Sequence, residues 1–269
     1  MAEPTVAGAY AALVRSRIAA QTSYRSSFTL DLGAQVLLCV VEFAEVYVVF
    51  HNVSALGGFS YAEVALMFGL ATTGFGLADM VVGHLDRMPF YVRTGQLDAF
   101  LLRPLSALGQ VVTSDFSLRR LGRIGVAVAI LAVALVRVDI DWTPARVLLL
   151  VVTPLSGAVI FGAVFVATAA LSFWLVEGTE FANAFTYGGS YLSSFPFSVF
   201  GTAVRRFFTF VVPAAFVAYL PALALLGRED PVGLPTWASW SAAPVAVLAA
   251  GASVLAWQAA LRQYVGAGS

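Results

Sequence analysis

The sequence predicts an all-α, polytopic membrane protein. Of its 269 residues, 60% are hydrophobic and 11% are charged, whereas soluble domains average about 25% charged residues. The mean hydropathy of +0.87 holds over the whole length, and the apolar residues come in blocks of about the 20 residues that a helix needs to cross a bilayer. Because backbone groups in lipid must be hydrogen-bonded internally, such blocks form helices. We therefore expect one transmembrane domain over residues 1–269.

Residues 4–26 are predicted to form an interfacial helix ahead of the first span. Apolar side chains recur there at helical spacing and arginines remain on the polar side; the apolar set is Val6, Tyr10, Leu13, Val14 and Ile18, and the arginines are Arg15, Arg17 and Arg25. A helix of this kind can lie along the membrane surface. Residues 1–27 contain no apolar core of signal-peptide length, so the first span is expected to act as an uncleaved anchor.

Six transmembrane helices are predicted, at residues 28–50, 61–82, 118–136, 147–176, 207–226 and 241–261. The second contains Ala65, Gly69 and Thr73, a row of small residues that allows close helix contact. The fifth contains Pro213 and Pro221, which are expected to kink it.

The third span is the shortest of the six. Only residues 124–136 are free of charge, which corresponds to about 20 Å of helix against a hydrocarbon core of about 30 Å. We expect Arg120, Arg123 and Arg137 at its ends to extend their head groups toward the membrane surfaces.

Residues 181–204 are open to two interpretations. They are uncharged and long enough to span, yet they contain Asn183, Thr186 and Pro196 together with several glycines and serines. Cytoplasmic loops of membrane proteins carry an excess of arginine. With six spans and a cytoplasmic N-terminus, all of the 15 arginines lie on the cytoplasmic side except Arg137, Arg146 and Arg228. A crossing at 181–204 would move Arg205 and Arg206 outside as well. We therefore expect residues 177–204 to form a second cytoplasmic or re-entrant element, with both termini cytoplasmic.

Several function classes are excluded by residues that the chain lacks. A P-loop needs a lysine to reach the phosphates, and the sequence contains no lysine, so any ATP hydrolysis belongs to another polypeptide. Neither the HExxH zinc signature nor the GxSxG elbow occurs. His51 and His84 are far apart, and Cys39 is the sole cysteine. We expect no catalytic residues, no bound cofactor or metal, and no nucleic-acid partner.

Three carboxylates are candidates for lining a transport pathway. Glu42 and Glu45 lie three residues apart on one face of the first span, and Asp79 lies near the end of the second. Carboxylates within a membrane are costly, and function is the default hypothesis for them. Structural pairing is an equal alternative for Glu42 and Glu45, and for Asp79 an arginine partner near the interface is favoured.

The loop at 83–106 carries the sharpest signal. It reads GHLDRMPFYVRTGQLDAFLLRPLS, which predicts short surface helices with a break at Gly95 and a stop at Arg103 and Pro104. Its apolar side chains are too many for a solvated loop, so they should bury against the membrane or a partner protein; they are Phe90, Tyr91, Leu97, Phe100, Leu101 and Leu102.

Residues 93–106, RTGQLDAFLLRPLS, resemble the RxGxLDxxLxRPLS signature of bacterial type-2 ABC transporter permeases, in the small six-span branch. Supporting similarities are Tyr24-Arg25 before the first span, Arg205-Arg206 before Val212-Pro213, and Tyr219-Leu-Pro221. The resemblance covers nearly the whole chain.

The resemblance implies an exporter permease of the bacterial plasma membrane. It would pair with a second permease, identical or different, and dock two copies of a separate ATPase that holds the ATP and magnesium. Residues 4–26 would form a connecting helix and 83–106 the cytoplasmic coupling helix, with 177–204 as a second contact. The residues implied in ATPase coupling are Arg87, Arg93, Gly95, Leu97, Asp98, Leu102, Arg103 and Pro104.

Two other functions remain open. One is a proton-coupled secondary transporter that uses Glu42 and Glu45 as a relay, although no inverted repeat with matched broken helices is evident. The other is a membrane scaffold subunit without a pathway. The first predicts transport by this chain alone, and the second predicts that polar residues in the spans can be replaced without loss.

Overall fold

The computed structural model describes residues 6–23, 25–174 and 179–264. Its α-helices are α1 (Val6–Ser23), α2 (Arg25–Asn52), α3 (Tyr61–Val82), α4 (Met88–Arg93), α5 (Gln96–Leu101), α6 (Ala107–Ser114), α7 (Leu121–Arg137), α8 (Pro144–Leu171), α9 (Thr179–Ser193), α10 (Thr202–Phe210), α11 (Tyr219–Leu226) and α12 (Ala242–Gln263). Short 3₁₀ helices are η1 (Gly83–Arg87), η2 (Leu118–Arg120), η3 (Phe197–Val199), η4 (Ala214–Phe216) and η5 (Thr236–Trp240). Within the described residues the fold is all-helical, as predicted.

Four helices, α2, α3, α8 and α12, are long and apolar enough to cross a membrane. A further pair, α10 with η4–α11, passes the same test together but is bent by 73°. α7 has 17 residues, so it extends about 25 Å and falls short of that criterion, as expected for the shortest span. The structure thus supports a multi-pass membrane protein with four to five span candidates, and the predicted six are not confirmed.

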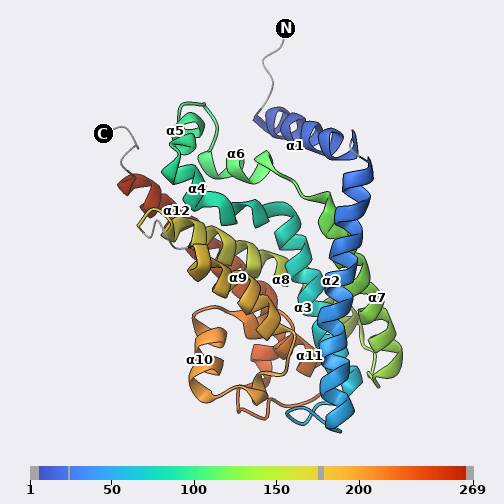
Figure 1. The fold of residues 1–269 in the computed structure, drawn as a ribbon. Helices are drawn as coiled ribbons and strands as arrows, with labels where there is room; N and C mark the ends of the chain where they lie inside the picture. The colour runs from blue at the N-terminus through green and yellow to red at the C-terminus, as the bar shows by residue number, and fades with distance from the viewer. Residues whose placement is uncertain (1–5, 24, 175–178, 265–269) are drawn as a thin grey trace.

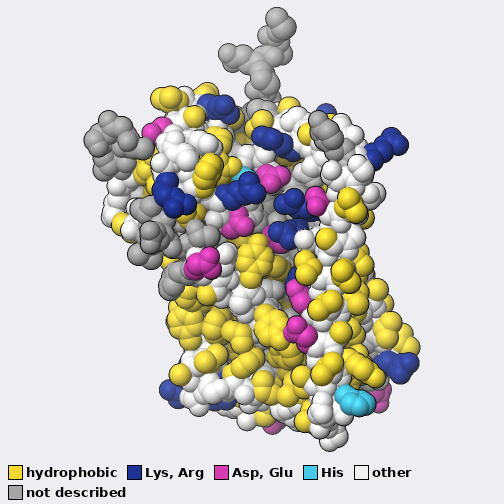
Figure 2. Space-filling view, viewed as in Figure 1, with side chains coloured by type: hydrophobic (Ala, Val, Ile, Leu, Met, Phe, Trp, Pro, Cys, Tyr) yellow, Lys and Arg dark blue, Asp and Glu magenta, His cyan; other side chains and the backbone are white. Residues whose placement is uncertain are grey.

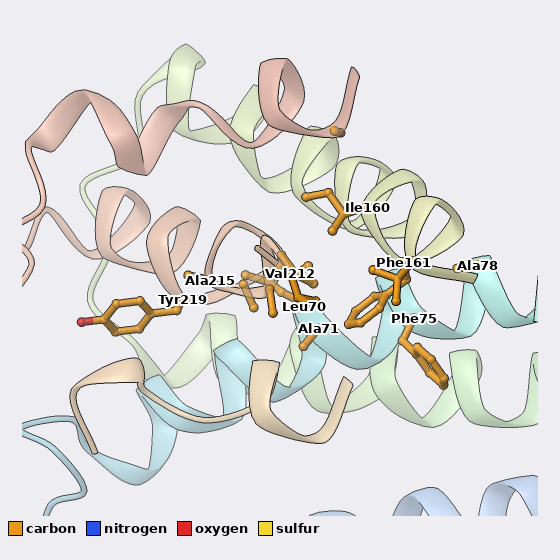
Figure 3. Close-up of a cluster of buried hydrophobic side chains, with 14 of the residues drawn as sticks. Leu70, Ala71, Phe75, Ala78, Ile160, Phe161, Val212, Ala215 and Tyr219 are labelled. Atoms are coloured by element: carbon orange, nitrogen blue, oxygen red, sulfur yellow. The ribbon is translucent and has the colours of Figure 1, made fainter. Parts of the chain in front are cut away.

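The buried helix α3 forms the centre of the bundle and packs against α7 and α8. A Cβ atom on Gly69 would lie 2.9 Å from the Cα atom of Leu131 in α7, and one on Gly74 would lie 3.1 Å from the Pro154 carbonyl in α8. The predicted close contact at Gly69 is therefore present. Figure 3 shows the apolar core, in which Phe75 of α3 and Phe161 of α8 meet edge to face at 5.2 Å between ring centroids.

The bundle has two distinct ends (Figure 1). The proximal end consists of α1, η1 and α4–α6, where Gln21 of α1 accepts from the Leu118 amide at 3.1 Å. The distal end consists of residues 53–60, 138–143 and 227–241, where Arg228 donates to the Gly58 carbonyl and to Glu63, both at 2.9 Å. α2, α3, α7, α8 and α12 run between these two ends.

The helix α1 lies across the proximal end of α2 (Figure 1). Tyr10, Leu13, Val14 and Ile18 on it are half-buried, whereas Arg15 and Arg17 are exposed. The sidedness predicted for residues 4–26 is therefore present within α1; residues 4, 5 and 24 lie outside the described residues.

The segment at 177–204 differs from expectation, because α9 and η3 run from the proximal to the distal end. Before α9, the indole of Trp174 donates to Gln263 at the proximal end of α12 at 2.9 Å. After α9, Ser198 donates to the Gly57 carbonyl in the distal loop at 3.0 Å. Residues 177–178 lie outside the described residues. The segment therefore does not remain on the side of residues 83–106.

The polar composition of this segment misled the prediction, because its hydroxyls are satisfied within their own helix. Thr186 donates to the Ala182 carbonyl at 3.0 Å, and Ser193 donates to the Gly189 carbonyl at 2.8 Å. Such bonds remove most of the cost of burying a hydroxyl.

Residues 207–226 also differ from expectation, since they do not form one continuous span. The chain breaks between α10 and η4 at Pro213, whereas Pro221 lies in the first turn of α11, where proline is tolerated. Arg205 near the start of this pair and Asp230 just beyond its end line the same small cavity. The pair therefore enters the bundle from the distal end and returns to it.

Candidate functional site

The loop at 83–106 folds into two short helices, α4 and α5, that turn back on each other at the proximal end. Gly95 between them adopts a φ of 68°, a left-handed conformation that glycine accepts without strain. Gly83, where α3 ends, leaves no room for a side chain, because an added Cβ would collide with the Asp79 carboxylate. The predicted short helices and the break at Gly95 are both present.

The residues implied in ATPase coupling fall into two groups. Arg87, Arg93, Leu102, Arg103 and Pro104 are exposed, whereas Gly95 and Asp98 are half-buried and Leu97 is fully buried. Leu97 therefore holds α5 onto the bundle and cannot touch a partner directly.

The apolar side chains of the loop divide in the same way. Tyr91, Leu97 and Phe100 pack against the core, whereas Phe90, Leu101 and Leu102 are 48%, 42% and 87% exposed. We call the exposed set Phe90, Leu101 and Leu102 with Arg87, Arg93 and Arg103 the docking surface. Figure 2 shows arginine side chains gathered at this end of the molecule, above a largely apolar middle. A surface of this kind fits a protein partner better than water.

Gln110 fastens the docking surface to the bundle from behind. Its buried side-chain amide donates to the carbonyls of Phe100 at 2.8 Å and Leu105 at 3.0 Å. One side chain on α6 thus fixes the backbone on both sides of Leu102 and Arg103. Nothing in the sequence pattern singles out this glutamine, and the sequence prediction missed it.

His84 makes a second attachment. One ring nitrogen hydrogen-bonds to the Tyr91 hydroxyl of α4, and the other lies 3.3 Å from the Asp115 carboxylate beyond α6. The hydrogen bond from His84 lowers the pKa of Asp115, and burial raises the pKa of the neighbouring Asp86. In the sequence, His84 stands out only as too far from His51 to share a metal, and neither of its attachments is predicted.

A belt of ion pairs joins α2 and α3 to η2 and the start of α7 next to the proximal end. Arg123 holds Glu42 with two bonds of 2.8 and 2.6 Å, and Arg120 lies 2.7 Å from Asp79. The looser pair of Arg119 and Asp31 is 3.9 Å apart. The arginine partner expected for Asp79 is present, and Glu42 has one too. These two carboxylates therefore fix helix positions in the structure as it stands.

Glu45 differs from the other two candidate carboxylates. Its carboxylate accepts from the Tyr191 hydroxyl of α9 at 2.9 Å and has no arginine partner among the described residues. It lies about one turn beyond Glu42 toward the distal end, and its side chain is exposed. Of the three candidates, it is the one that a pathway or a partner could reach.

Within the described residues, no three histidine, cysteine or carboxylate side chains cluster in a way that could hold a metal ion.

Comparison with known proteins gives one match. The model of a family described as "ABC-2 family transporter protein" matches residues 36–268, which is most of the chain and includes the docking surface, the ion pairs of Glu42 and Asp79, and α9–α12. No curated protein and no solved structure matches significantly.

Proposed function

We propose that this chain, which belongs to the ABC-2 family of transporter proteins, is the permease subunit of an exporter whose ATP and magnesium are held by a separate ATPase. The absence of lysine, and with it of a P-loop, is the reason for placing the nucleotide on another polypeptide. Two ATPase copies would serve a pair of permeases.

The docking surface carries this proposal. An exposed Leu102, flanked by Leu101, Phe90 and three arginines, is held rigidly by Gln110 and His84. Interface cores favour apolar and arginine side chains, and a prearranged surface loses less entropy on binding. The contact of α1 with α6, through Tyr10 and Ser106, makes α1 a second route by which ATPase movement reaches the bundle.

We place the proximal end in the cytoplasm of a bacterial cell, which makes both termini cytoplasmic. Six helices would then cross the plasma membrane: α2, α3, α7, α8, α9 and α12. The α10–α11 pair would enter from outside and return. All arginines except Arg137, Arg146, Arg205, Arg206 and Arg228 would then lie inside, which keeps the cytoplasmic excess of positive charge.

The exposed face of α2 around Glu45 supports a second permease. A carboxylate facing lipid at this depth costs about 2.5–3.5 kcal/mol, so the Glu45–Tyr191 pair is better placed at a protein interface or a wet pathway. We infer that the second permease covers this face and that the transport pathway runs along it.

The coupling mechanism follows from the attachments behind the docking surface. ATP-driven closure of the ATPases would move α4 and α5, and His84 and Gln110 would pass this movement to η1 and α6. Since Asp79 ties α3 to η2, and Glu42 ties α2 to α7, which follows η2 directly, these helices would shift together. Nucleotide changes this equilibrium only through its different affinity for the two conformations.

Proton-coupled transport by this chain alone is less well supported. Glu42 is held by two bonds from Arg123, which leaves Glu45, bonded to the Tyr191 hydroxyl, as the single member of the supposed relay without an ion pair among the described residues.

The test is co-purification with the ATPase and measurement of its activity. Arg103→Glu and Leu102→Asp should each reduce the amount of ATPase recovered at least tenfold. Each variant places a carboxylate in a contact that is expected to exclude water. Arg137→Glu is the matched control, since Arg137 is equally a surface arginine but lies at the far end of α7. Normal ATPase recovery and transport in the Arg103 and Leu102 variants would reject the proposed surface.

A further inference from the structure

The segment from α10 to η4 lines one side of an apolar cavity of about 770 Å³, and α8 and α12 line the other. Its walls include Ile160 and Val164 from α8, Ala249 and Ala252 from α12, and Phe207 and Phe210 from α10. The volume lies in the range of small-molecule sites, about 300–1,000 Å³. Ile160 and Val212 on its inner wall belong to the core cluster of Figure 3.

Two of the three polar side chains in this wall are hydrogen-bonded within their own helix, and the third, Thr209, lines both this cavity and the smaller one described below. Thr168 donates to the Val164 carbonyl at 3.0 Å, and Ser253 donates to the Ala250 carbonyl at 2.9 Å. An occupant of the inner part therefore meets hydrocarbon on nearly every side, which fits an acyl chain.

The cavity is open sideways. Leu248, Phe210 and Val211 on its rim are 72%, 70% and 66% exposed. Because α8 and α12 are membrane-span candidates, this opening faces the bilayer and not water, and lipid can enter from the side.

A smaller cavity of about 160 Å³ continues from the first at the distal end. The two share Thr209 and Phe210, and the smaller one is lined by Arg205, Arg206 and Asp230. Neither arginine has an ion pair or side-chain hydrogen bond within the described chain. The Asp230 carboxylate is already engaged by the Tyr219 hydroxyl at 2.6 Å and by the amides of Val232 and Leu234 at 3.2 and 3.1 Å. The smaller cavity thus has two unpaired positive charges and one satisfied negative charge.

We propose that the two cavities form one binding site for a bilayer phospholipid with an anionic headgroup. The acyl chain occupies the apolar cavity, and the phosphate lies between Arg205 and Arg206 one helical turn away. Arginine guanidinium groups match phosphate geometry with paired hydrogen bonds. The bound lipid fills the space beneath α10 and fastens the re-entrant pair to α8 and α12.

The experiment uses the full-length chain in nanodiscs that contain equal amounts of phosphatidylglycerol and phosphatidylcholine. In turn, each lipid carries a photoreactive diazirine in its tail, and labelled peptides are located by mass spectrometry. The reference for unselective lipid is residues 148–155, where Leu148, Val151 and Leu155 are exposed on α8 outside the cavity.

In the wild type, we expect residues 207–216 and 245–256 to be labelled more by phosphatidylglycerol than by phosphatidylcholine. The ratio of the two labelling yields should exceed the ratio at the reference residues by at least fivefold. The double variant Arg205→Gln with Arg206→Gln should reduce this ratio to the reference value, while labelling by phosphatidylcholine stays unchanged. Ala252→Trp should reduce labelling by both lipids, and Arg137→Gln should change neither.

Equal ratios at the cavity and the reference in the wild type would overturn the proposal, as would an unchanged ratio in the double variant. The wild-type comparison decides even if the double variant fails to fold. The assay contains no ATPase, so its outcome is independent of the docking surface.

Discussion

At the scale of single residues, Gln110 is the side chain on which the shape of the docking surface depends most. Gln110→Leu keeps the volume but removes the side-chain donor to both carbonyls, which leaves Leu105 without this bond and Phe100 with only the backbone amide of Arg103 at 3.4 Å. Leaving such groups unsatisfied costs about 1–3 kcal/mol, so the loop should open at least about fivefold more often. Limited chymotrypsin cleavage after the exposed Leu102, located by mass spectrometry, measures this directly. Gln96→Leu on the exposed side of α5 is the control, and equal cleavage rates in the two variants would contradict the role of Gln110.

The pair of Glu42 and Arg123 gives a second residue-scale prediction. Glu42→Leu leaves the largely buried Arg123 guanidinium without its carboxylate. Breaking a buried pair in this way lowers the free energy of unfolding by about 3–5 kcal/mol. The lower figure applies here, because the Glu42 side chain is 30% exposed. The thermal unfolding midpoint in detergent should fall by about 6 °C or more. Exchanging the two residues, Glu42→Arg with Arg123→Glu, should recover most of the loss.

Glu45→Leu is the matched control for this pair. It removes a carboxylate three residues away that has only Tyr191 as a partner, so stability should change little. If Glu42→Leu were as stable as the wild type and yet inactive in transport, Glu42 would line the pathway instead of fixing α2 to α7.

The sequence could identify these carboxylates but could not rank them. A carboxylate in an apolar run stands out because it is costly there, and spacing placed Glu42 and Glu45 on one face. Which of the two meets an arginine depends on how α7 packs against α2, a contact between residues 81 positions apart. Gln110 and His84 were missed for a related reason, since a lone polar residue near a loop carries no pattern of its own.

At the scale of helices, the contact between α3 and α7 depends on Gly69. A methyl group there would lie 2.7 to 3.0 Å from the Leu131 side chain and backbone, so the helices must separate. Gly69→Ala is expected to destabilise the protein by about 1–3 kcal/mol. Gly125→Ala on α7 is the control, because nothing lies within 4 Å of its added Cβ, and there alanine should be neutral or stabilising by up to about 1 kcal/mol. Thermal unfolding of both variants makes the comparison, and equal midpoints would show that the helices do not pack at Gly69.

The sequence predicted some helices well and others poorly, and the difference has a physical cause. α3 lies at the residues predicted for the second span, and α2, α8 and α12 lie close to their predicted positions. A long apolar run forms a helix in the bilayer whatever its neighbours are, so its position can be predicted from the sequence. α9 and the α10–α11 pair follow their predicted courses less closely, because their course is set by contacts with one another, and the 73° bend in the pair fits either a broken span or a re-entrant loop. Arg205 and Arg206 were counted as cytoplasmic by the positive-inside rule, yet they lie beside the distal loop at Asp230.

At the scale of the whole molecule, the course of α9 decides the topology, and accessibility to a membrane-impermeant thiol reagent tests it. The natural Cys39 is buried and can be replaced to give a cysteine-free background. Val199→Cys after α9 and Val232→Cys in the distal loop should then both react from outside intact cells, since both sites belong to the distal end. Thr94→Cys between α4 and α5 should react only after the cells are opened.

The two topologies differ at a single site in this experiment. If residues 177–204 stayed on the cytoplasmic side, Val199→Cys would behave like Thr94→Cys, and the α10–α11 pair would have to cross the membrane despite its 73° bend. If both 199 and 232 are labelled from outside, α9 must cross the membrane. The chain between these two positions must then begin and end on the outer side. That result would make α10–α11 a re-entrant hairpin and retain six crossings with both termini on the same side as the docking surface.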